Sequence, residues 1–563
     1  MAREEGLQAK HPIVLIPGII STGLESWSTS KCSGKYFRHR MWGTITMFRA
    51  VLLDKDCWTE HMRLDPETGL DPPHIKLRAA QGLDAADYFI AGYWVWGKII
   101  ENLAAIGYDN NNMHLAAYDW RLAFANLEKR DQYFSKLKST IELAHKLDNQ
   151  KAVLVAHSMG ANVIMYFLKW VESPLGGNGG PTWVNDHIHT FVNLAGPLLG
   201  LPKTVASVLS GEMRDTVQPL GEYVLERFYS KAERAALFRT WGGLSSMLPR
   251  GGDLLWGDLD SGAPDDRPDN PVSYSTMLYF HPEKDRHSLE EEAEQGAYNA
   301  SLNTPDGPRP FRNMTVEAAL ELLHATAGHS YNRMIKKYYS YGLAPTAEVL
   351  AANARQHQTW SNPLETTLPN APDMQVYCLY GYGKETERGY AYTRTPSMNN
   401  EAHSNSNDNS TSAAPPPPVC IDSSYSREAY GIDNGVLVGE GDGTVPLISL
   451  GYMCADGWRI PRYNPAGIRV YTREFPHQPT SIVRDLRGGA NSADHVDILG
   501  NAALTATILR IAAGADEAIR KDDIISPIKE YARKITERIH EGQMWPQNKV
   551  THQEATADRI EEL

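Results

Sequence analysis

Short apolar runs alternate with stretches of helical periodicity through the first 200 residues. The apolar runs have the length and composition of buried strands, and they cover residues 13–16, 113–118, 152–156 and 191–195. Between them, apolar residues recur with the period of an α-helix at residues 93–106 and 133–147. Strands that alternate with helices in this way predict βαβ units and therefore a parallel sheet.

The strand pattern fades after about residue 200 and returns near residue 372. In between, helical pieces such as residues 316–325 alternate with loops rich in Pro, Gly and Asp. New strands are predicted at 374–380 and 468–472. We therefore expect one α/β domain with an insertion, divided into a first core part at 11–200, a cap at 201–371 with a polar surface loop at 258–312, a second core part at 372–514 with a low-complexity loop at 399–418, and a charged helical tail at 515–563.

Composition and charge narrow the range of partners. The chain has 563 residues, with 55 Lys and Arg against 68 Asp and Glu, a formal charge of −13 and no basic stripe. This balance argues against nucleic acid as a partner. No stretch reaches the roughly 18 apolar residues of a membrane span, and the start of the chain is polar, unlike a signal peptide.

The five cysteines are informative through their placement. Cys32 and Cys57 bracket one loop, Cys420 and Cys454 bracket another, and Cys378 lies in a predicted strand. We expect disulfides Cys32–Cys57 and Cys420–Cys454, with a buried thiol at Cys378. Five reduced thiols in a cytosolic enzyme are the alternative, because sequence does not fix connectivity. Three glycosylation sequons in polar stretches favour an oxidising lumen: Asn299, Asn313 and Asn409.

A candidate nucleophile follows the strand at 152–156. The strand runs directly into His157-Ser158-Met159-Gly160, and a helical pattern continues over 161–170. A serine on a sharp turn between strand and helix is typical of the G-x-S-x-G nucleophile of α/β-hydrolases. Ala156 replaces the first glycine, a mild change because the position requires only a small residue. The five-residue motif also occurs by chance, so the flanking strand and helix carry the prediction.

The nucleophile needs a base and an orienting acid. In α/β-hydrolases the chain order is Ser, then Asp or Glu, then His, which points to the last part of this chain. Asp442 lies on a turn between glycines, and His495 lies in a loop before an apolar helix at 498–512. Taken alone, Asp442 could be a turn residue and His495 a helix-end residue. Because Asp442 and His495 follow Ser158 in the required chain order, we predict that the three residues form a catalytic triad. His477 is the alternative base.

An oxyanion hole requires two backbone N–H groups near the nucleophile. The residue after the serine, Met159, supplies the first candidate. The second candidate is Ile19, because the predicted strand at 13–16 is followed by a Pro-Gly turn. A simple connecting turn is the alternative interpretation of that segment.

From His11 to about Ile539, the chain resembles the phospholipid:diacylglycerol acyltransferases of plant and algal type, which are relatives of lecithin:cholesterol acyltransferase. So many family motifs, in the same order along the chain, are not expected by chance. They are Pro17-Gly18-Ile19, Cys57-Trp58 with Glu60-His61-Met62, Leu70-Asp71-Pro72-Pro73, Ala117-Tyr118-Asp119-Trp120-Arg121, His157-Ser158-Met159-Gly160, Ser246-Met247-Leu248-Pro249, Ser361-Asn362-Pro363-Leu364, Gly441-Asp442-Gly443-Thr444-Val445-Pro446 and His495-Val496-Asp497.

The resemblance implies an α/β-hydrolase fold and a specific reaction without metal or cofactor. Ser158 would attack the sn-2 ester of a membrane phospholipid, release lysophospholipid and pass the acyl chain to diacylglycerol, giving triacylglycerol. Asp442 and His495 would be the acid and the base, and the amides of Ile19 and Met159 the oxyanion hole. The alternatives are transfer to water, as in a phospholipase or lipase, transfer to a sterol, and a lipid carrier without catalysis.

The resemblance also implies a lid loop at 32–57, closed by Cys32 and Cys57. Its apolar residues suit contact with a membrane surface or a cover over the site, with ordinary packing as the alternative. The aromatic run at 88–96 is expected to pack against the sheet.

Relatives carry an N-terminal tail and a membrane span, whereas this chain has a short polar lead. We expect a membrane-associated protein with a lumenal catalytic domain in the endoplasmic reticulum, with a plastid as the alternative.

Overall fold

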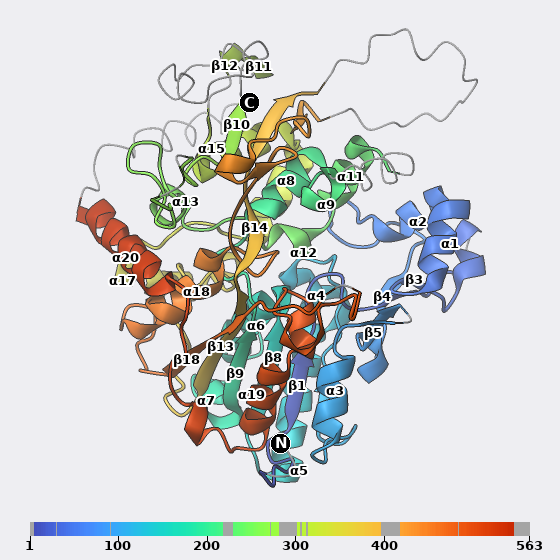
Figure 1. Ribbon diagram of the computed structural model, residues 1–563. Helices are drawn as coiled ribbons and strands as arrows, with labels where there is room; N and C mark the ends of the chain where they lie inside the picture. Colours follow the sequence, from blue (N-terminus) through green and yellow to red (C-terminus); the bar gives the residue numbers. More distant parts are fainter. Residues whose placement is uncertain are drawn as a thin grey trace.

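The computed structural model describes residues 5–29, 31–90, 92–217, 229–268, 270, 272–280, 301–304, 307–310, 313–395, 417–481 and 483–544. A six-stranded sheet in the order β18-β13-β9-β8-β1-β7 forms its centre, and every neighbouring pair is parallel (Figure 1). The strands are β1 (Ile13–Ile16), β7 (Met113–Leu115), β8 (Ala152–His157), β9 (Ile188–Leu194), β13 (Gln375–Tyr382) and β18 (Arg469–Pro476). The predicted parallel sheet is therefore present.

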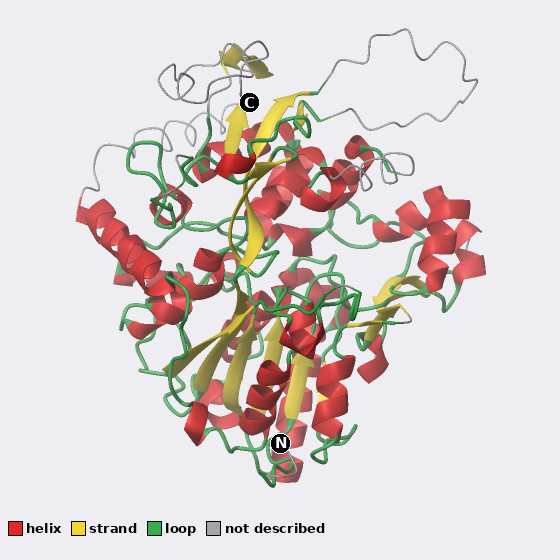
Figure 2. Ribbon diagram, viewed as in Figure 1, coloured by secondary structure: helices red, strands yellow, loops and turns green. Residues whose placement is uncertain are grey.

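Helices cover both faces of the central sheet (Figure 2). They include α3 (Gly97–Ala104), α5 (Tyr133–Asp148), α6 (Met159–Glu172) and α19 (Ala502–Ala512). In β1, Val14 belongs to the core that includes α5 and α6, whereas Leu15 belongs to the core that includes α3 and α19. Because successive side chains of a strand point to opposite faces and both faces are covered, the central strands are continuous apolar runs in the sequence.

A second, five-stranded sheet lies above the central one in Figure 1. Its path is β10-β14-β17-β16, with β15 paired to β14. The helix α8 contacts β14, and α11 packs on α8. These elements are α8 (Pro202–Ser210), α11 (Lys231–Phe238), β10 (Leu278–Phe280), β14 (Lys384–Arg394), β15 (Val419–Ile421), β16 (Ile432–Asp433) and β17 (Val436–Gly441).

The second sheet crosses the boundary expected between cap and core at residue 371. Strand β10, from the expected cap, pairs with β14, from the expected second core part. Gly383, with φ 91°, turns the chain from β13 of the central sheet into β14. The sequence of β14 is polar, yet Arg388 is only 1% exposed because its guanidinium pairs with Asp265 at 3.0 Å and lies over the Trp256 ring. A strand buried through ion pairs gives no apolar signal.

A small unit at the side of the core contains the expected lid loop. It consists of β2 (Leu24–Ser26), β3 (Arg40–Trp42), α1 (Ile45–Leu53), α2 (Lys55–Met62) and β4 (Leu77–Ala79). Strand β2 pairs with both β3 and β4. A disulfide joins Cys32 to Cys57, which belongs to α2. Helices α1 and α2 project away from the core (Figure 1).

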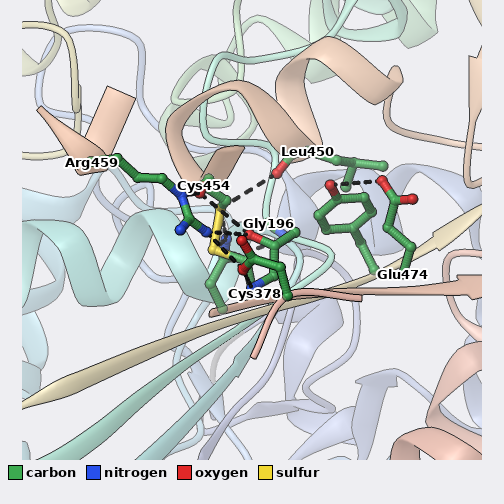
Figure 3. Close-up of a disulfide and its surroundings, with 10 residues drawn as sticks. Gly196, Cys378, Leu450, Cys454, Arg459 and Glu474 are labelled. Carbon is green, nitrogen blue, oxygen red and sulfur yellow. Dashed lines mark hydrogen bonds and ion pairs between the residues drawn. A yellow bond between two sulfur atoms is a disulfide. The ribbon is translucent and has the colours of Figure 1, made fainter. Parts of the chain in front are cut away.

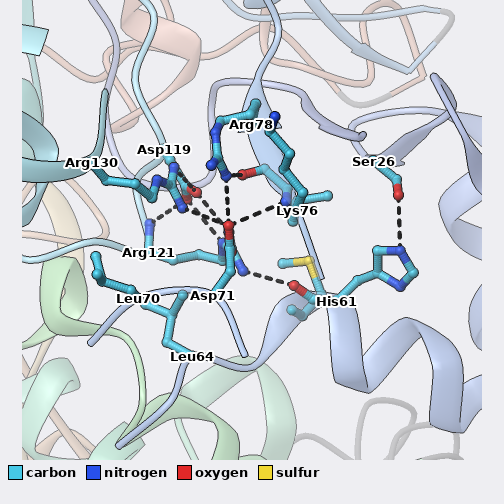
Figure 4. A network of polar contacts seen from close by, with 12 residues as sticks. Ser26, His61, Leu64, Leu70, Asp71, Lys76, Arg78, Asp119, Arg121 and Arg130 are labelled. Atoms are coloured by element: carbon cyan, nitrogen blue, oxygen red, sulfur yellow. Dashed lines mark hydrogen bonds and ion pairs between the residues drawn. The ribbon is translucent and has the colours of Figure 1, made fainter. Parts of the chain in front are cut away.

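A buried ionic network attaches this small unit to the core (Figure 4). The Arg121 guanidinium donates to Asp119 at 2.6 Å, to Asp71 at 3.0 Å and to the carbonyl oxygen of His61 at 2.7 Å. Arg130 reaches the same two carboxylates, Asp119 at 2.8 Å and Asp71 at 3.2 Å. Asp71 and His61 belong to the small unit, whereas the other three residues follow β7 in the core. The network therefore fixes one unit against the other.

The second disulfide differs from the expected one. Cys454, in α18 (Leu447–Ala455), pairs with Cys378 of β13 across a Cα–Cα distance of 6.2 Å (Figure 3). Cys420 is a buried free thiol. The expected Cys420–Cys454 bridge is wrong because Cys420 belongs to β15 of the second sheet, whereas α18 packs on β13. Position in the fold, rather than proximity along the chain, decides the pairing.

Parts of the chain fall outside the description. Only portions of the polar loop expected at 258–312 are described, and of the low-complexity loop at 399–418 only residues 417 and 418 are. Asn299 and Asn409 also lie outside the described residues. The expected tail contains α20 (Ile528–Met544), and residues 545–563 lie beyond the description. Within the described ranges, no helix has both the length and the apolarity needed to cross a membrane.

Candidate active site

Ser158 lies on the sharp turn between β8 and α6, with φ 56° and ψ −130°. Positive φ is rare outside glycine, so the turn is strained. The Ser158 N–H donates to the Leu194 carbonyl oxygen at 2.9 Å, which holds the turn against β9. A Cβ on Gly160 would lie 2.7 Å from the carbonyl oxygen of Ile16, so position 160 needs glycine for α6 to pass β1.

His495 and Asp442 complete a chain of hydrogen bonds that begins at Ser158. The Ser158 hydroxyl donates to Nε2 of His495 at 2.9 Å, and Nδ1–H of His495 donates to Oδ2 of Asp442 at 2.6 Å. The backbone N–H of His495 also donates to the carbonyl oxygen of Asp442 at 2.8 Å. The structure thus brings the three predicted residues together, and all three side chains are buried.

The turn that follows β17 holds the Asp442 carboxylate in place. Its Oδ1 accepts the backbone N–H groups of Thr444 at 3.0 Å and Val445 at 2.8 Å, which leaves Oδ2 for His495. These two backbone hydrogen bonds fix the orientation of the carboxylate toward His495. A charged Asp442 favours the His495 tautomer with the proton on Nδ1, so Nε2 is free to accept from Ser158.

His157, directly before the nucleophile, contacts the base from behind. Its Nε2–H donates to the carbonyl oxygen of His495 at 2.7 Å, and the two ring centroids are 5.0 Å apart. Burial, together with the neighbouring His495, lowers the pKa of His157 to about 3, so the ring is neutral at ordinary pH. This role of His157 was not predicted from the sequence, although the place of His157 beside Ser158 was a usable signal.

A salt bridge ties the loop that carries His495 to the second sheet. Lys384 at the start of β14 pairs with Asp494, the neighbour of His495. Burial alone would raise the pKa of Asp494, but the Lys384 ammonium outweighs it and holds that pKa below its usual value. Sequence reasoning missed this pair, because the two residues are 110 positions apart.

The rival base, His477, does not take part in this arrangement. Its ring Nδ1 accepts the backbone N–H of Ala493 at 3.1 Å, and its backbone N–H donates to the carbonyl oxygen of Tyr382 at 2.8 Å. Among the described residues, the histidine that hydrogen-bonds to Ser158 is His495.

The two candidate oxyanion amides flank the nucleophile. Met159 is the first residue of α6, so its N–H has no acceptor within the helix. Ile19 follows Gly18, where a Cβ would lie 2.8 Å from the Cβ of Ser158, so this turn passes very close to the nucleophile. Ile20 has φ 57°, unusual for a β-branched residue, and its carbonyl oxygen accepts a hydrogen bond from Trp42 at 2.7 Å.

The fold and the site define a class of protein. A parallel sheet flanked by helices, a strained serine between strand and helix, and an Asp and a His that follow it in chain order are the features of the α/β-hydrolase fold. Among the described residues, no cluster of three or more His, Cys, Asp or Glu side chains could hold a metal ion.

Comparison with known proteins identifies the family. The family model described as lecithin:cholesterol acyltransferase matches residues 36–502, and the chain belongs to this family. It is 46% identical over 533 residues to the phospholipid:diacylglycerol acyltransferase of Schizosaccharomyces pombe, covering 94% of this chain and 77% of the relative. The protein of that name from Saccharomyces cerevisiae is 45% identical over 529 residues, covering 92% of this chain and 73% of the relative.

A plant relative is less similar. Phospholipid:diacylglycerol acyltransferase 1 of Arabidopsis thaliana is 38% identical over 593 residues, covering 95% of this chain and 85% of the relative. The resemblance seen in the sequence is therefore confirmed at the level of the family. The plant and algal type that we expected is not favoured, because the two fungal proteins share more identical residues with this chain.

Proposed function

We propose that this protein transfers the sn-2 acyl chain of a phospholipid to diacylglycerol through an acyl-enzyme on Ser158. The observation that carries the proposal is the hydrogen-bonded chain from Ser158 through His495 to Asp442, at 2.9 and 2.6 Å. The names of three relatives, each matched over more than nine-tenths of this chain, support the choice of donor and acceptor. The products are lysophospholipid and triacylglycerol.

The first half-reaction forms the acyl-enzyme. His495 Nε2 takes the hydroxyl proton of Ser158 as Oγ attacks the sn-2 carbonyl carbon. Asp442 stabilises the imidazolium that forms, and the N–H groups of Ile19 and Met159 donate to the oxyanion. His495 then returns the proton to the departing sn-2 oxygen, and lysophospholipid leaves.

The second half-reaction repeats these steps with a different acceptor. The free hydroxyl of diacylglycerol gives its proton to His495 and attacks the acyl carbonyl carbon. The tetrahedral intermediate collapses, Ser158 leaves and recovers the proton from His495, and triacylglycerol is released. The same acyl-enzyme yields a free fatty acid when water takes the place of diacylglycerol, so acceptor access decides between transferase and phospholipase.

Exposed apolar residues on α1 support a membrane surface as partner. Met47 and Ala50 face the core, whereas four large apolar residues on other sides of the helix are exposed by 43 to 78%. Ordinary packing does not account for side chains that are so exposed, and an apolar helix face suits the boundary between headgroups and acyl chains. The four residues are Ile45, Phe48, Leu52 and Leu53.

The lumen of the endoplasmic reticulum is the proposed location of the catalytic domain. Two disulfides, Cys32–Cys57 and Cys378–Cys454, suit an oxidising compartment. A plastid location is the alternative. Blocking free thiols in the freshly isolated protein and then counting thiols released by reduction distinguishes an oxidising from a reducing origin.

Product analysis with defined lipids tests the proposed reaction. Phosphatidylcholine labelled in its sn-2 chain is supplied with and without diacylglycerol, and labelled triacylglycerol is compared with labelled free fatty acid. We expect triacylglycerol to dominate when diacylglycerol is present, and Ser158→Ala to form neither product. Labelled triacylglycerol from Ser158→Ala would contradict the assigned nucleophile, and free fatty acid alone from the wild type would identify a phospholipase.

A further inference from the structure

The loop between β18 and His495 ends in an apolar tip, which we define as residues 483–488. Val483 is 91% exposed and Leu486 is 85% exposed, the two highest values for large apolar side chains in the described part of the chain. A side chain of this kind is usually covered at least in part, and two within one short turn form a local apolar surface.

The tip is held in a defined shape by backbone hydrogen bonds. At its base, the Gln478 N–H donates to Asn491 at 3.1 Å, and the Thr480 N–H donates to Gly488 at 2.8 Å. Within the tip, the Gly488 N–H donates to the Asp485 carbonyl oxygen at 3.1 Å. The two apolar side chains are therefore presented outward by an ordered turn.

Arg487 anchors the tip to the aromatic hairpin formed by β5 (Tyr88–Ile90) and β6 (Tyr93–Trp94). Its guanidinium lies 3.7 Å from the ring centroid of Trp94 and 4.1 Å from that of Tyr93. It also donates to the carboxylate of Asp497 at 2.6 Å, two residues after His495. The tip is thus connected both to the hairpin and to the loop that carries the base.

Aromatic contacts continue from this hairpin to the small unit that carries α1. The ring of Phe89 lies 6.2 Å from that of Tyr93 and 5.5 Å from that of Trp42. Trp42 ends β3, shortly before α1, and its indole N–H binds the carbonyl oxygen of Ile20 beside the candidate oxyanion turn. The rings of Tyr93, Phe89 and Trp42 therefore form a continuous aromatic path from the tip to the small unit that carries α1. This path passes beside the candidate oxyanion turn.

We propose that the 483–488 tip is a second contact with a phospholipid bilayer, which acts with α1 to hold the candidate active site against the lipid surface. This inference rests on the proposed function and extends it. Val483 and Leu486 suit the acyl-chain region, while partly exposed Tyr88 and Tyr93, 38% and 40% exposed, suit the headgroup level. Arg484 is exposed in the same turn, so its guanidinium is available to lipid phosphate.

Vesicle binding of a double variant provides the first test. Val483→Ser with Leu486→Ser removes the apolar surface and keeps the turn polar and small. With phosphatidylcholine vesicles that contain diacylglycerol, we expect binding to weaken about tenfold or more, since two apolar side chains no longer leave water. Acyl transfer on vesicles should fall by at least tenfold more than turnover of a soluble short-chain nitrophenyl ester.

A matched control lies on the opposite part of the molecule. Leu143 and Leu147 on α5 are 57% and 71% exposed and belong to neither the site nor the aromatic path. The double variant Leu143→Ser with Leu147→Ser should bind vesicles as the wild type does. An equal loss in both double variants, or no loss in the tip variant, would overturn the inference.

A fluorescent label on the tip provides a second test that does not depend on the stability of the double variant. Val483→Cys can be labelled selectively, because four native cysteines form disulfides and Cys420 is buried. An environment-sensitive fluorophore there should brighten on vesicles and be quenched by lipids with spin labels on their acyl chains. The same label at Ile45→Cys reports on α1.

The two labels separate the possible outcomes. Quenching at both positions supports two contacts with the bilayer. Quenching at Ile45→Cys alone would overturn the tip contact while leaving the proposed function intact, and would point to a protein as the partner of the tip. If both labels are quenched but the wild-type protein makes no triacylglycerol from defined lipids, the result counts against the proposed reaction and not against the tip contact.

Discussion

Two buried polar networks lie near the carboxyl ends of the central strands, and they differ in what their ends contact. In the network of Asp71, Asp119, Arg121 and Arg130, charges pair with opposite charges and the Arg121 side chain is fully buried. The network of Asp442 and His495 ends instead on the hydroxyl of Ser158. A network in which every charge is paired with an opposite charge stabilises the folded structure. A network that ends on a serine hydroxyl can instead activate that hydroxyl for attack on a substrate.

Structural and reactive buried charges in this fold can therefore be separated by mutation. Truncating a member of the ionic network should cost stability and leave the chemistry of the surviving folded molecules intact. Truncating a member of the Ser158 network should cost chemistry and leave stability nearly unchanged. Each of the following changes tests one side of this contrast.

The largest effect is expected from Asp442→Asn. An amide keeps the size of the side chain but no longer favours the His495 tautomer with the proton on Nδ1, so Nε2 ceases to accept from Ser158. We expect the rate of acyl transfer to fall by about 10⁴-fold, with the melting temperature nearly unchanged. Steady-state rates and thermal unfolding measure the two quantities. A large loss of stability with an unchanged rate would place Asp442 among the structural charges.

The opposite pattern is expected from Arg121→Met. The variant leaves Asp119 and Asp71 buried with one guanidinium fewer, and breaking a buried pair costs about 3–5 kcal/mol. Urea unfolding measures the change. Active-site titration with a fluorophosphonate should give an unchanged rate per labelled molecule. As a control, Asp84→Asn alters an exposed contact with Arg40 and should change the free energy of unfolding by less than about 1 kcal/mol.

The contrast also explains which features could be predicted from the sequence. The strand at 152–156 and the serine after it were predictable, because a doubly covered strand must be apolar and the turn needs small neighbours. Asp442 and His495 became predictable through chain order and family motifs. Strand β14 was not, because Arg388 is buried through an ion pair with Asp265, a partner that only the folded chain brings close.

The cysteines show the same limit. Cys32 and Cys57 lie close along the chain and close in the fold, so the bracketed loop predicted their pairing. Cys378 and Cys454 are 76 positions apart, and they meet because α18 packs against β13. Contacts of this kind depend on the arrangement of whole elements, which local patterns do not contain.

The stability that the ionic network contributes should depend on pH. Burial alone would raise the pKa of Asp119, but the guanidinium groups of Arg121 and Arg130 outweigh it and hold that pKa well below its usual range. A carboxylate with a lowered pKa stabilises the fold above the unfolded value of about 3.9, and this contribution is lost as the pH falls below it. We expect a loss of about 2 kcal/mol between pH 5 and pH 2 in urea unfolding. Asp119→Asn should flatten that slope, and an unchanged slope would exclude Asp119 as its source.

The smallest effect is expected from His157, which touches the reactive network without belonging to it. His157→Phe keeps a ring but removes the hydrogen bond to the His495 carbonyl oxygen. We expect kcat to fall about tenfold with little change in KM, because the base is less well oriented while substrate binding is untouched. His157→Gln, which retains an N–H donor, should recover part of the loss. Equal losses in both variants would assign His157 a packing role.

The pH dependence of stability separates orientation from packing at this position. Burial lowers the pKa of His157 to about 3, so the folded protein binds fewer protons there than the unfolded chain below the unfolded value of about 6.5. Stability from this neutral ring is therefore complete at neutral pH and declines as the pH falls below about 6.5. His157→Phe should remove that part of the decline, which urea unfolding at pH 7 and pH 4 measures. An unchanged decline in His157→Phe would exclude His157 as its source and leave its ring with a packing role.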